Sequence, residues 1–253
     1  MGASQTDLGN IADLGVRFIG KFDVKDSRLV KTRRLEGLRD LGDGLQGIRQ
    51  AISLGVEELY INDTVATLYS KEPPLDFLTE VRTATLNPIT FAGGVASVQK
   101  ARDLISAGAD RIALNSALFG NLELLKQLED ELGAQSVVLQ VDAMLSENKW
   151  WVTSNAGRET HGISLETWLD RTCQIFSGEI LLTAINAEGL GRGFPRDILP
   201  HVTDVENGVI LCGGLSSFDE IVELSKGSSA LSFSGSGIIN GLSRDQLRSS
   251  HAN

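Results

Sequence analysis

The sequence contains little cysteine, since only Cys173 and Cys212 occur in 253 residues. Two thiols are too few for a disulfide framework or a cysteine-based zinc site, which favours a reducing, cytoplasmic environment. The chain also has no run of about 18 apolar residues, the length that a membrane-spanning helix requires. Its first residues lack the basic-then-apolar order of a signal peptide. We expect residues 1–13, approximately, to form an extension outside the fold.

Positive charge is scarce as well. Lysine and arginine total 23 against 33 aspartates and glutamates, which gives a formal net charge of -10. This balance argues against general binding of nucleic acids or acidic membranes, although backbone N–H groups can still bind a small anion. The histidines have no metal-ligand spacing, and no Walker loop, nucleophile elbow or dinucleotide fingerprint occurs in a supporting context. We therefore expect no metal and no cofactor.

What the chain does have is a regular alternation of short apolar runs and longer amphipathic stretches. This alternation is typical of βα units and a parallel sheet. The expected strands cover residues 16–22, 58–61, 89–92, 111–114, 136–141, 179–184, 209–212 and 230–234. The expected helices include residues 44–54, 97–107, 122–132, 165–175 and 218–224. This pattern predicts one α/β domain over residues 1–253, a (β/α)8 TIM barrel.

The second half of the chain repeats landmarks of the first. Residues 91–95 read Phe-Ala-Gly-Gly-Val, and residues 211–215 read Leu-Cys-Gly-Gly-Leu. Asp23 ends the first expected strand, and Asp142 ends the fifth. The repeat is too long for a solenoid and instead favours a barrel built from two similar half-barrels. The alternative is chance similarity between βα units.

Each Gly-Gly pair follows an expected strand and precedes an expected helix. Glycine lets the backbone approach a ligand, and the helix start contributes N–H groups and the positive end of its dipole. Since active sites of these barrels lie at the C-terminal ends of the strands, the pairs predict two phosphate sites on opposite sides of the mouth. A ligand that spans them carries a phosphate at each end. The alternative is a tight strand-to-helix turn.

Asp23 and Asp142 end strands that face each other across an eight-stranded barrel. Two carboxylates beside one ligand can divide the roles of acid and base if their environments separate their pKa values. We expect both side chains to rest on apolar residues and to be exposed at the mouth. The alternative is that each aspartate caps a loop, as Asp does at many strand ends.

One connection is expected to be long, the basic segment at residues 25–42. Long loops in compact folds are often lids or binding loops, and the alternative is a solvated basic loop. At the opposite ends of the strands lie four charges, Arg17, Glu58, Arg111 and Glu179. Charges inside a barrel need partners, so the alternating signs predict a ring across its floor. On these residues alone, a structural ionic plug and a functional role are equally favoured.

Several segments together resemble the cyclase subunit family of imidazole glycerol phosphate synthase, from histidine biosynthesis. They are Phe-Asp-Val-Lys-Asp at residues 22–26, Leu-Val-Lys at 29–31, Leu-Arg-Asp-Leu-Gly-Asp at 38–43, Gly-Ala-Asp-Arg at 108–111 and Gly-Glu-Ile-Leu-Leu-Thr at 178–183. The resemblance implies a lyase that converts a bisphosphorylated ribulosyl-formimino aminoimidazole carboxamide ribonucleotide into imidazole glycerol phosphate and an aminoimidazole carboxamide ribotide. It also implies a heterodimer in which a glutaminase subunit supplies ammonia through the barrel.

The resemblance assigns roles to individual residues. Asp23 matches the catalytic base, Asp142 the catalytic acid, and Lys31 the lysine of a mobile loop. One phosphate site matches Gly93, Gly94, Asn115 and Ser116. The other phosphate site matches Gly189, Gly213, Gly214 and the region of Ser234. The gate at the ammonia entrance matches Arg17, Glu58, Arg111 and Glu179.

The chain departs from the family pattern at the ligand end. The departures are Ala92 for a glycine, Ala156 and Cys212 for serines, Asn186 and Glu188 for aspartates, and Leu190 for a hydroxyl residue. These changes concern the substrate more than the fold. They leave two alternatives to cyclisation: a barrel that channels ammonia for the amidation of surface-polysaccharide sugars, and a catalytically impaired barrel that binds phosphate ligands.

Overall fold

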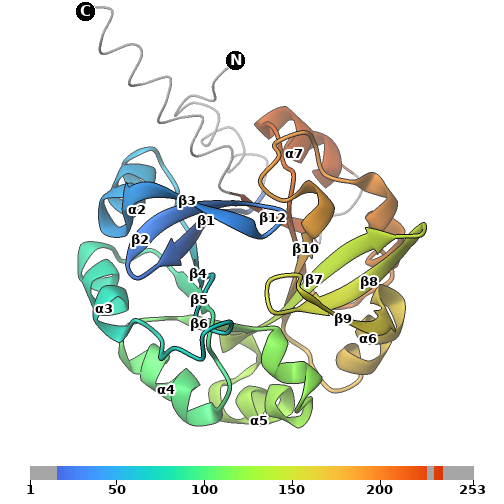
Figure 1. The fold of residues 1–253 in the computed structure, drawn as a ribbon, viewed down its shortest axis with the longest axis horizontal. Coiled ribbons are helices and arrows are strands. Elements are labelled where there is room, and N and C mark those ends of the chain that lie inside the picture. The colour runs from blue at the N-terminus through green and yellow to red at the C-terminus, as the bar shows by residue number, and fades with distance from the viewer. Residues whose placement is uncertain (1–15, 227–230, 236–253) are drawn as a thin grey trace, which may run out of the picture.

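A closed barrel of eight parallel strands forms the centre of the computed structural model, which describes residues 16–226 and 231–235 (Figure 1). The barrel strands are β1 (Phe18–Lys25), β4 (Leu59–Asp63), β5 (Ile89–Ala92), β6 (Arg111–Leu114), β7 (Val137–Ser146), β10 (Glu179–Ala184), β11 (Val209–Cys212) and β12 (Leu231–Gly235). They follow one another around the barrel in chain order, and β12 closes it against β1. The predicted (β/α)8 barrel is therefore confirmed.

Helices surround the barrel on its outside (Figure 1). They are α2 (Gly44–Ser53), α3 (Leu75–Ala84), α4 (Val98–Ser106), α5 (Glu123–Leu132), α6 (Leu165–Cys173) and α7 (Phe218–Ser225). Several begin at a residue whose side chain accepts a backbone N–H of the first turn, namely Asp43, Ser97, Ser164 and Ser217. The sequence analysis missed α3, whose cap position is Pro74 and has no such hydrogen bond. That helix lacks the local start signal that a capping side chain provides.

Apolar side chains form two separate layers. The larger cluster lies between strands and helices and includes Phe91, Leu139 and Leu182. The smaller cluster fills the barrel interior and consists of Ile19, Tyr60, Ala92, Ala113, Val138, Leu181, Ile210 and Cys212. Because the barrel strands are buried on both faces, their sequences are almost continuously apolar.

Two antiparallel hairpins extend from the C-terminal ends of barrel strands. The first, β2 (Arg28–Arg33) and β3 (Glu36–Asp43), follows β1, and the second, β8 (Lys149–Ser154) and β9 (Glu159–Ser164), follows β7. The expected long loop at residues 25–42 is therefore wrong. Its turn residues, Arg34 and Leu35, both have positive φ. Asn or Gly usually occupies such positions in a two-residue hairpin turn, so the sequence carries no ordinary turn signal.

Two further expectations concern the last strand and the N-terminal residues. The strand expected at residues 230–234 is β12, displaced by one residue. The expected extension at residues 1–13 lies outside the described residues. Over residues 16–226 and 231–235, none of the helices combines the length and the apolar character needed to cross a membrane.

Candidate active site

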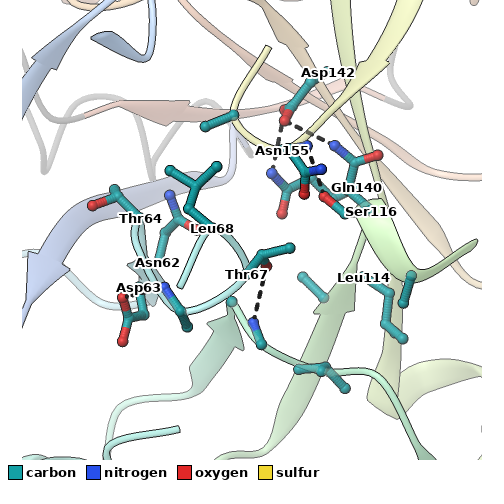
Figure 2. Close-up of a pocket in the computed structure, with 18 of the residues that line it drawn as sticks. Asn62, Asp63, Thr64, Thr67, Leu68, Leu114, Ser116, Gln140, Asp142 and Asn155 are labelled. Atoms are coloured by element: carbon teal, nitrogen blue, oxygen red, sulfur yellow. Dashed lines mark hydrogen bonds between the residues drawn. The ribbon is translucent and has the colours of Figure 1, made fainter. Parts of the chain in front are cut away.

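A cavity of about 350 Å³ lies at the C-terminal ends of the strands, on one side of the barrel mouth (Figure 2). Its walls come mainly from the segments that follow β4, β5, β6 and β7, and Lys21, Thr32 and Thr183 also line it. The residues expected at the first phosphate site all line it, namely Gly93, Gly94, Asn115 and Ser116. Those expected at the second site, Gly189, Gly213, Gly214 and Ser234, are not among its lining residues.

Asp142 borders this cavity and is only 3% exposed. Its Oδ2 accepts a hydrogen bond from Asn115 Nδ2 at 2.9 Å, and its Oδ1 accepts one from Gln140 Nε2 at 3.2 Å (Figure 2). Gln140 is itself held in place, because its Oε1 accepts from the Tyr60 hydroxyl at 2.8 Å. Burial raises the pKa of Asp142, and the hydrogen bond from Gln140 offsets only part of that rise. Asp142 therefore holds a proton to higher pH than an exposed aspartate does.

Asp23 is buried to the same extent but has different partners. Its Oδ1 accepts from Asn62 Nδ2 at 2.9 Å and lies 3.7 Å from Lys21 Nζ. Its Oδ2 accepts from the Thr32 hydroxyl at 3.4 Å. Burial raises the pKa of Asp23 above its ordinary value, and the Lys21 ammonium offsets only part of that rise. Both carboxyl groups therefore accept from amide groups, and the Lys21 ammonium lies close to Asp23 in addition.

The expectation that both aspartates are exposed at the mouth is wrong. Asp142 reaches the cavity, but Asp23 lies beneath the β2–β3 hairpin, which contributes the Thr32 hydroxyl. At the turn of this hairpin, the Arg34 N–H donates to the Glu188 carbonyl at 2.9 Å. The hairpin thus bridges the mouth from β1 to the segment after β10. Lys31 lies half-buried in β2, outside the residues that line the cavity.

The two Gly-Gly turns have almost the same backbone shape. In the Gly93 turn, formed by Gly93 and Gly94, the φ angles are 107° and 73°. In the Gly213 turn, formed by Gly213 and Gly214, they are 105° and 86°. Only glycine adopts such values without strain. The two halves of the chain therefore build the same local turn.

The two turns also share their immediate neighbours. A side chain on the first glycine of either turn would collide with the backbone at the end of the preceding barrel strand, at Asp63 or at Ala184. Each turn then leads into a helix whose cap is a serine, Ser97 before α4 and Ser217 before α7. This correspondence supports the interpretation of the barrel as two similar halves.

The surroundings of the Gly93 turn are open and carry positive charge. The Gly94 N–H donates to the Thr67 hydroxyl at 3.3 Å, and both groups face the cavity (Figure 2). Lys71 and Lys100 line the same cavity. Both ammonium groups are paired with acids, Lys71 with Asp26 at 2.6 Å and Lys100 with Glu72 at 3.0 Å, so a phosphate here would compete with these carboxylates for them.

The Gly213 turn is covered instead. The Gly193 N–H donates to the Gly214 carbonyl at 2.8 Å, and a side chain on Gly214 would lie 2.7 Å from the Ala187 Cβ. Gly189 is equally enclosed, since a side chain there would collide with the Thr32 carbonyl of the hairpin. The segment after β10 therefore occupies the place where the sequence predicts the second phosphate site.

The Glu220 carboxylate accepts hydrogen bonds from backbone N–H groups near the start of α7. Glu220 accepts from the Phe194 N–H at 2.6 Å, and from the Ser216 N–H and hydroxyl at 2.8 Å each. These are the kinds of donors that bind phosphate at helix starts. The first turn of α4 instead contains no acidic residue. The two predicted phosphate sites thus differ in charge as well as in access.

Ser234 lies inside the barrel. It pairs in register with Ile19 and Cys212, two residues of the interior cluster. Its buried hydroxyl has no hydrogen-bond partner among the described residues. Burial raises the pKa of the neighbouring Cys212 thiol to about 12, so that thiol is neutral at physiological pH.

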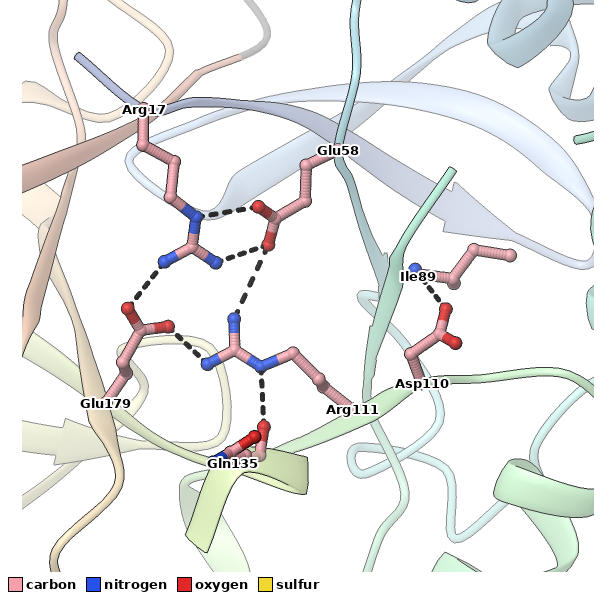
Figure 3. A network of polar contacts seen from close by, with 7 residues as sticks. All are labelled: Arg17, Glu58, Ile89, Asp110, Arg111, Gln135 and Glu179. Carbon is pink, nitrogen blue, oxygen red and sulfur yellow. Dashed lines mark hydrogen bonds and ion pairs between the residues drawn. The ribbon is translucent and has the colours of Figure 1, made fainter. Parts of the chain in front are cut away.

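The four charges expected at the floor do meet in a ring at the N-terminal ends of the strands (Figure 3). Arg17 donates to Glu58 at 2.6 and 2.7 Å, and to Glu179 at 2.5 Å. Arg111 pairs with Glu179 and, at 3.4 Å, with Glu58. Burial raises the pKa of Glu179, but the two arginines bring it below its ordinary value, Arg111 more than Arg17. Each acid is therefore shared by two cations, and the ring closes the floor.

The sequence analysis missed three residues that contact the aspartates. Lys21 and Asn62 contact Asp23, and Gln140 contacts Asp142. Lys21 and Gln140 each precede a predicted aspartate by two residues along a barrel strand, and Asn62 follows Glu58 of the ring by four. Since strand residues alternate between two faces, that spacing was a usable signal of an inward side chain. Glu188 was noted only as a departure. Its Oε1 accepts from Lys21 Nζ at 2.6 Å, and both side chains are buried.

Comparisons with known proteins agree with this geometry. The model of a family described as histidine biosynthesis protein matches residues 17–239. The chain is 34% identical over 210 residues to "Imidazole glycerol phosphate synthase subunit HisF" of Streptococcus mutans, covering 82% of this chain and 84% of the relative. For the protein of the same name from Pyrococcus furiosus, the values are 32% over 212 residues, 83% and 84%. For that of Legionella pneumophila, they are 34% over 207 residues, 81% and 98%.

Proposed function

This chain belongs to the histidine biosynthesis protein family, and we propose on that basis that it is the cyclase subunit of an imidazole glycerol phosphate synthase. The observation that carries the proposal is the pair of buried aspartates in one barrel mouth, one of them beside a cavity that the Gly93 turn, Asn115 and Ser116 line. The substrate is a bisphosphorylated ribulosyl-formimino aminoimidazole carboxamide ribonucleotide. Ammonia converts it into imidazole glycerol phosphate and an aminoimidazole carboxamide ribotide.

In this proposal the aspartates divide the proton transfers. Asp23 is the base, because the Lys21 ammonium at 3.7 Å favours its charged form. Asp142 is the acid, because its burial among amide groups favours its protonated form. The Gly93 turn, Asn115 and Ser116 hold the substrate phosphate that lies nearest to Asp142.

The partner of this subunit is a glutaminase that releases ammonia at the N-terminal face of the barrel. The charged ring is the gate through which the ammonia enters. Ionic contacts of this kind can exchange partners without losing a packed core, which suits a gate better than an apolar plug would.

One observation favours a second candidate function. The Gly213 side of the mouth holds the carboxylate of Glu220 on the N–H groups that a second phosphate would use. A ligand with phosphate at one end only fits that charge distribution, as expected if the barrel channels ammonia for the amidation of a surface-polysaccharide sugar.

The deciding experiment is an assay of the purified chain with ammonium salt and the ribulosyl substrate, which bypasses the glutaminase. Formation of imidazole glycerol phosphate supports the cyclase. A titration calorimetry experiment with the same substrate is run in parallel. Binding without turnover would favour an impaired phosphate-binding barrel, and neither binding nor turnover would favour the sugar-amidation barrel.

A further inference from the structure

Lys21 is a charged residue in the interior of the barrel. It lies on β1 between Arg17 of the floor ring and Asp23, an even number of residues from each and therefore on the same alternating face as both. Its side chain is 2% exposed. Burying an ammonium group costs several kcal/mol unless partners compensate, so its contacts decide what it does.

The contacts of Lys21 are two carboxylates. Its Nζ lies 2.6 Å from Glu188 Oε1 and 3.7 Å from Asp23 Oδ1. Burial disfavours the charged form of Lys21, but Asp23, Cys212 and Glu188 together hold its pKa well above the ordinary value. Lys21 is therefore a permanent cation, and the hydrogen bond to Glu188 fixes its position next to Asp23.

Asp142 has no ion pair in the described part of the chain, where its side-chain partners are Asn115, Gln140 and Thr183. The other titratable groups that face Lys21 and Asp23 are Glu188, Cys212, Tyr60 and Asp142. Burial raises the pKa of both Cys212 and Tyr60, so these two are neutral at physiological pH. Lys21 lowers the pKa of both aspartates, but among the described ion pairs only Asp23 lies close to its ammonium, at 3.7 Å, and Glu188 opposes the effect on Asp23.

We propose that Lys21 is a positioning residue that keeps Asp23 in its charged form and thereby assigns the base role to Asp23 and the acid role to Asp142. This inference rests on the proposed function for its catalytic meaning. Its electrostatic content, the effect of Lys21 on the titration of Asp23, can however be measured without turnover.

The test combines carboxyl ¹³C NMR with pH–rate profiles of the full chain in the ammonium-dependent assay. The Asp23 resonance is assigned by comparison with Asp23→Asn. In Lys21→Met we expect the Asp23 titration to move to higher pH by roughly 1–3 pH units, the range for a carboxylate that loses a cation at this distance. The acid limb of kcat/KM should move by the same amount, with activity recovering at higher pH. Lys21→Arg, which keeps the charge, should restore the original profile.

The variant Glu188→Gln should shift the Asp23 titration in the opposite direction from Lys21→Met, because Glu188 raises the pKa of Asp23. Its Asp23 titration should move to lower pH. Should Lys21→Met fail to fold, the double variant Lys21→Met with Glu188→Met removes both buried charges and leaves neither unpaired. We expect Asp23 in that variant to titrate above the wild-type pH, since Lys21 affects it more than Glu188 does.

An Asp23 titration that stays at the wild-type pH in a folded variant without the Lys21 charge would overturn the inference. Lack of turnover by the wild-type chain is a different result. It would count against the proposed function, while the NMR titration would still decide the role of Lys21.

Discussion

The Gly93 turn and the Gly213 turn are almost identical in backbone, yet one borders an open cavity and the other is covered. Their φ angles, their contacts with the preceding strand and their serine-capped helices correspond. What differs comes from elsewhere in the chain. The segment after β10 and Glu220 pack on the second turn, whereas lysines stand beside the first. The two turns therefore share a local frame, and packing by distant segments leaves one of them open and covers the other.

The two turns also differ in the charged residues that lie near them. The cavity beside the Gly93 turn is lined by Lys71 and Lys100, each paired with an acid, while the carboxylate of Glu220 packs beside the Gly213 turn. Charges of opposite sign at the two ends give a long ligand a preferred direction. The comparison can be tested at four levels, from catalysis to overall stability.

The largest effect is expected at the two aspartates. Asp142→Asn, beside the open cavity, and Asp23→Asn, beneath the hairpin, should each lower kcat by roughly 10²- to 10⁴-fold, the usual contribution of a general acid or base. If one aspartate alone were catalytic, the other variant would keep wild-type activity. Steady-state kinetics with ammonium salt measure both, and thermal unfolding checks that both remain folded.

The second effect concerns the second glycine of each turn. Gly214→Ala should lower the free energy of unfolding by about 1–3 kcal/mol more than Gly94→Ala, because the added methyl meets a packed backbone. At Gly94 the nearest atom to that methyl is the Ala66 Cβ at 3.1 Å. Gly133→Ala is the matched control, since Gly133 has φ +83° and open space around it. Equal losses in urea unfolding for the two turns would mean that the covering segment yields easily.

A smaller effect is expected on ligand affinity. Lys100→Gln should weaken phosphate binding and Glu220→Gln should strengthen it, each by a few-fold, or about 1 kcal/mol for a partly exposed charge. Calorimetric titration with inorganic phosphate and with substrate measures the two changes. Lys126→Gln, an exposed lysine of α5, serves as the control and should leave affinity unchanged. Weaker binding in Glu220→Gln would show that this carboxylate supports the site it occupies.

The smallest effect concerns the floor ring, where the second half contributes Glu179 and the first half contributes Arg17, Glu58 and Arg111. The folded-state pKa of Glu179 is below its ordinary value of 4.5. Its contribution to stability is therefore complete above the unfolded-state pKa and is lost as pH falls through the lower, folded-state pKa. Because the ring is partly exposed, we expect less than about 1 kcal/mol. Unfolding free energies of wild type and Glu179→Gln should converge between pH 4 and the acid limit; a constant difference would contradict this.

The sequence predicted the barrel and much of its site because both follow from local patterns. Strands β5, β6, β10 and β11 begin and end where their apolar runs do. The glycine turns and the aspartates are marked by residue type and position. The hairpin at Arg34 and Leu35 could not be predicted in this way, because two residues without turn preference adopt positive φ there.

The rest of the site depended on contacts between residues far apart in sequence. The ion pair of Lys21 and Glu188 joins positions 167 residues apart, and the cover over the Gly213 turn comes from a separate loop. No local pattern encodes such pairs. The position of Lys21 could have been suspected from strand alternation, but its partner could not.

The hydrogen bond from Tyr60 to Gln140 bears on whether a small molecule can pass through the barrel. It joins β4 to β7 across the barrel interior, which apolar side chains already fill. The described structure therefore has a packed barrel interior and not an open channel. A molecule the size of ammonia can then travel from ring to aspartates only when side chains turn aside in succession. If ammonia crosses this interior, as the proposed function requires, its passage depends on successive side-chain movements rather than on an open tube.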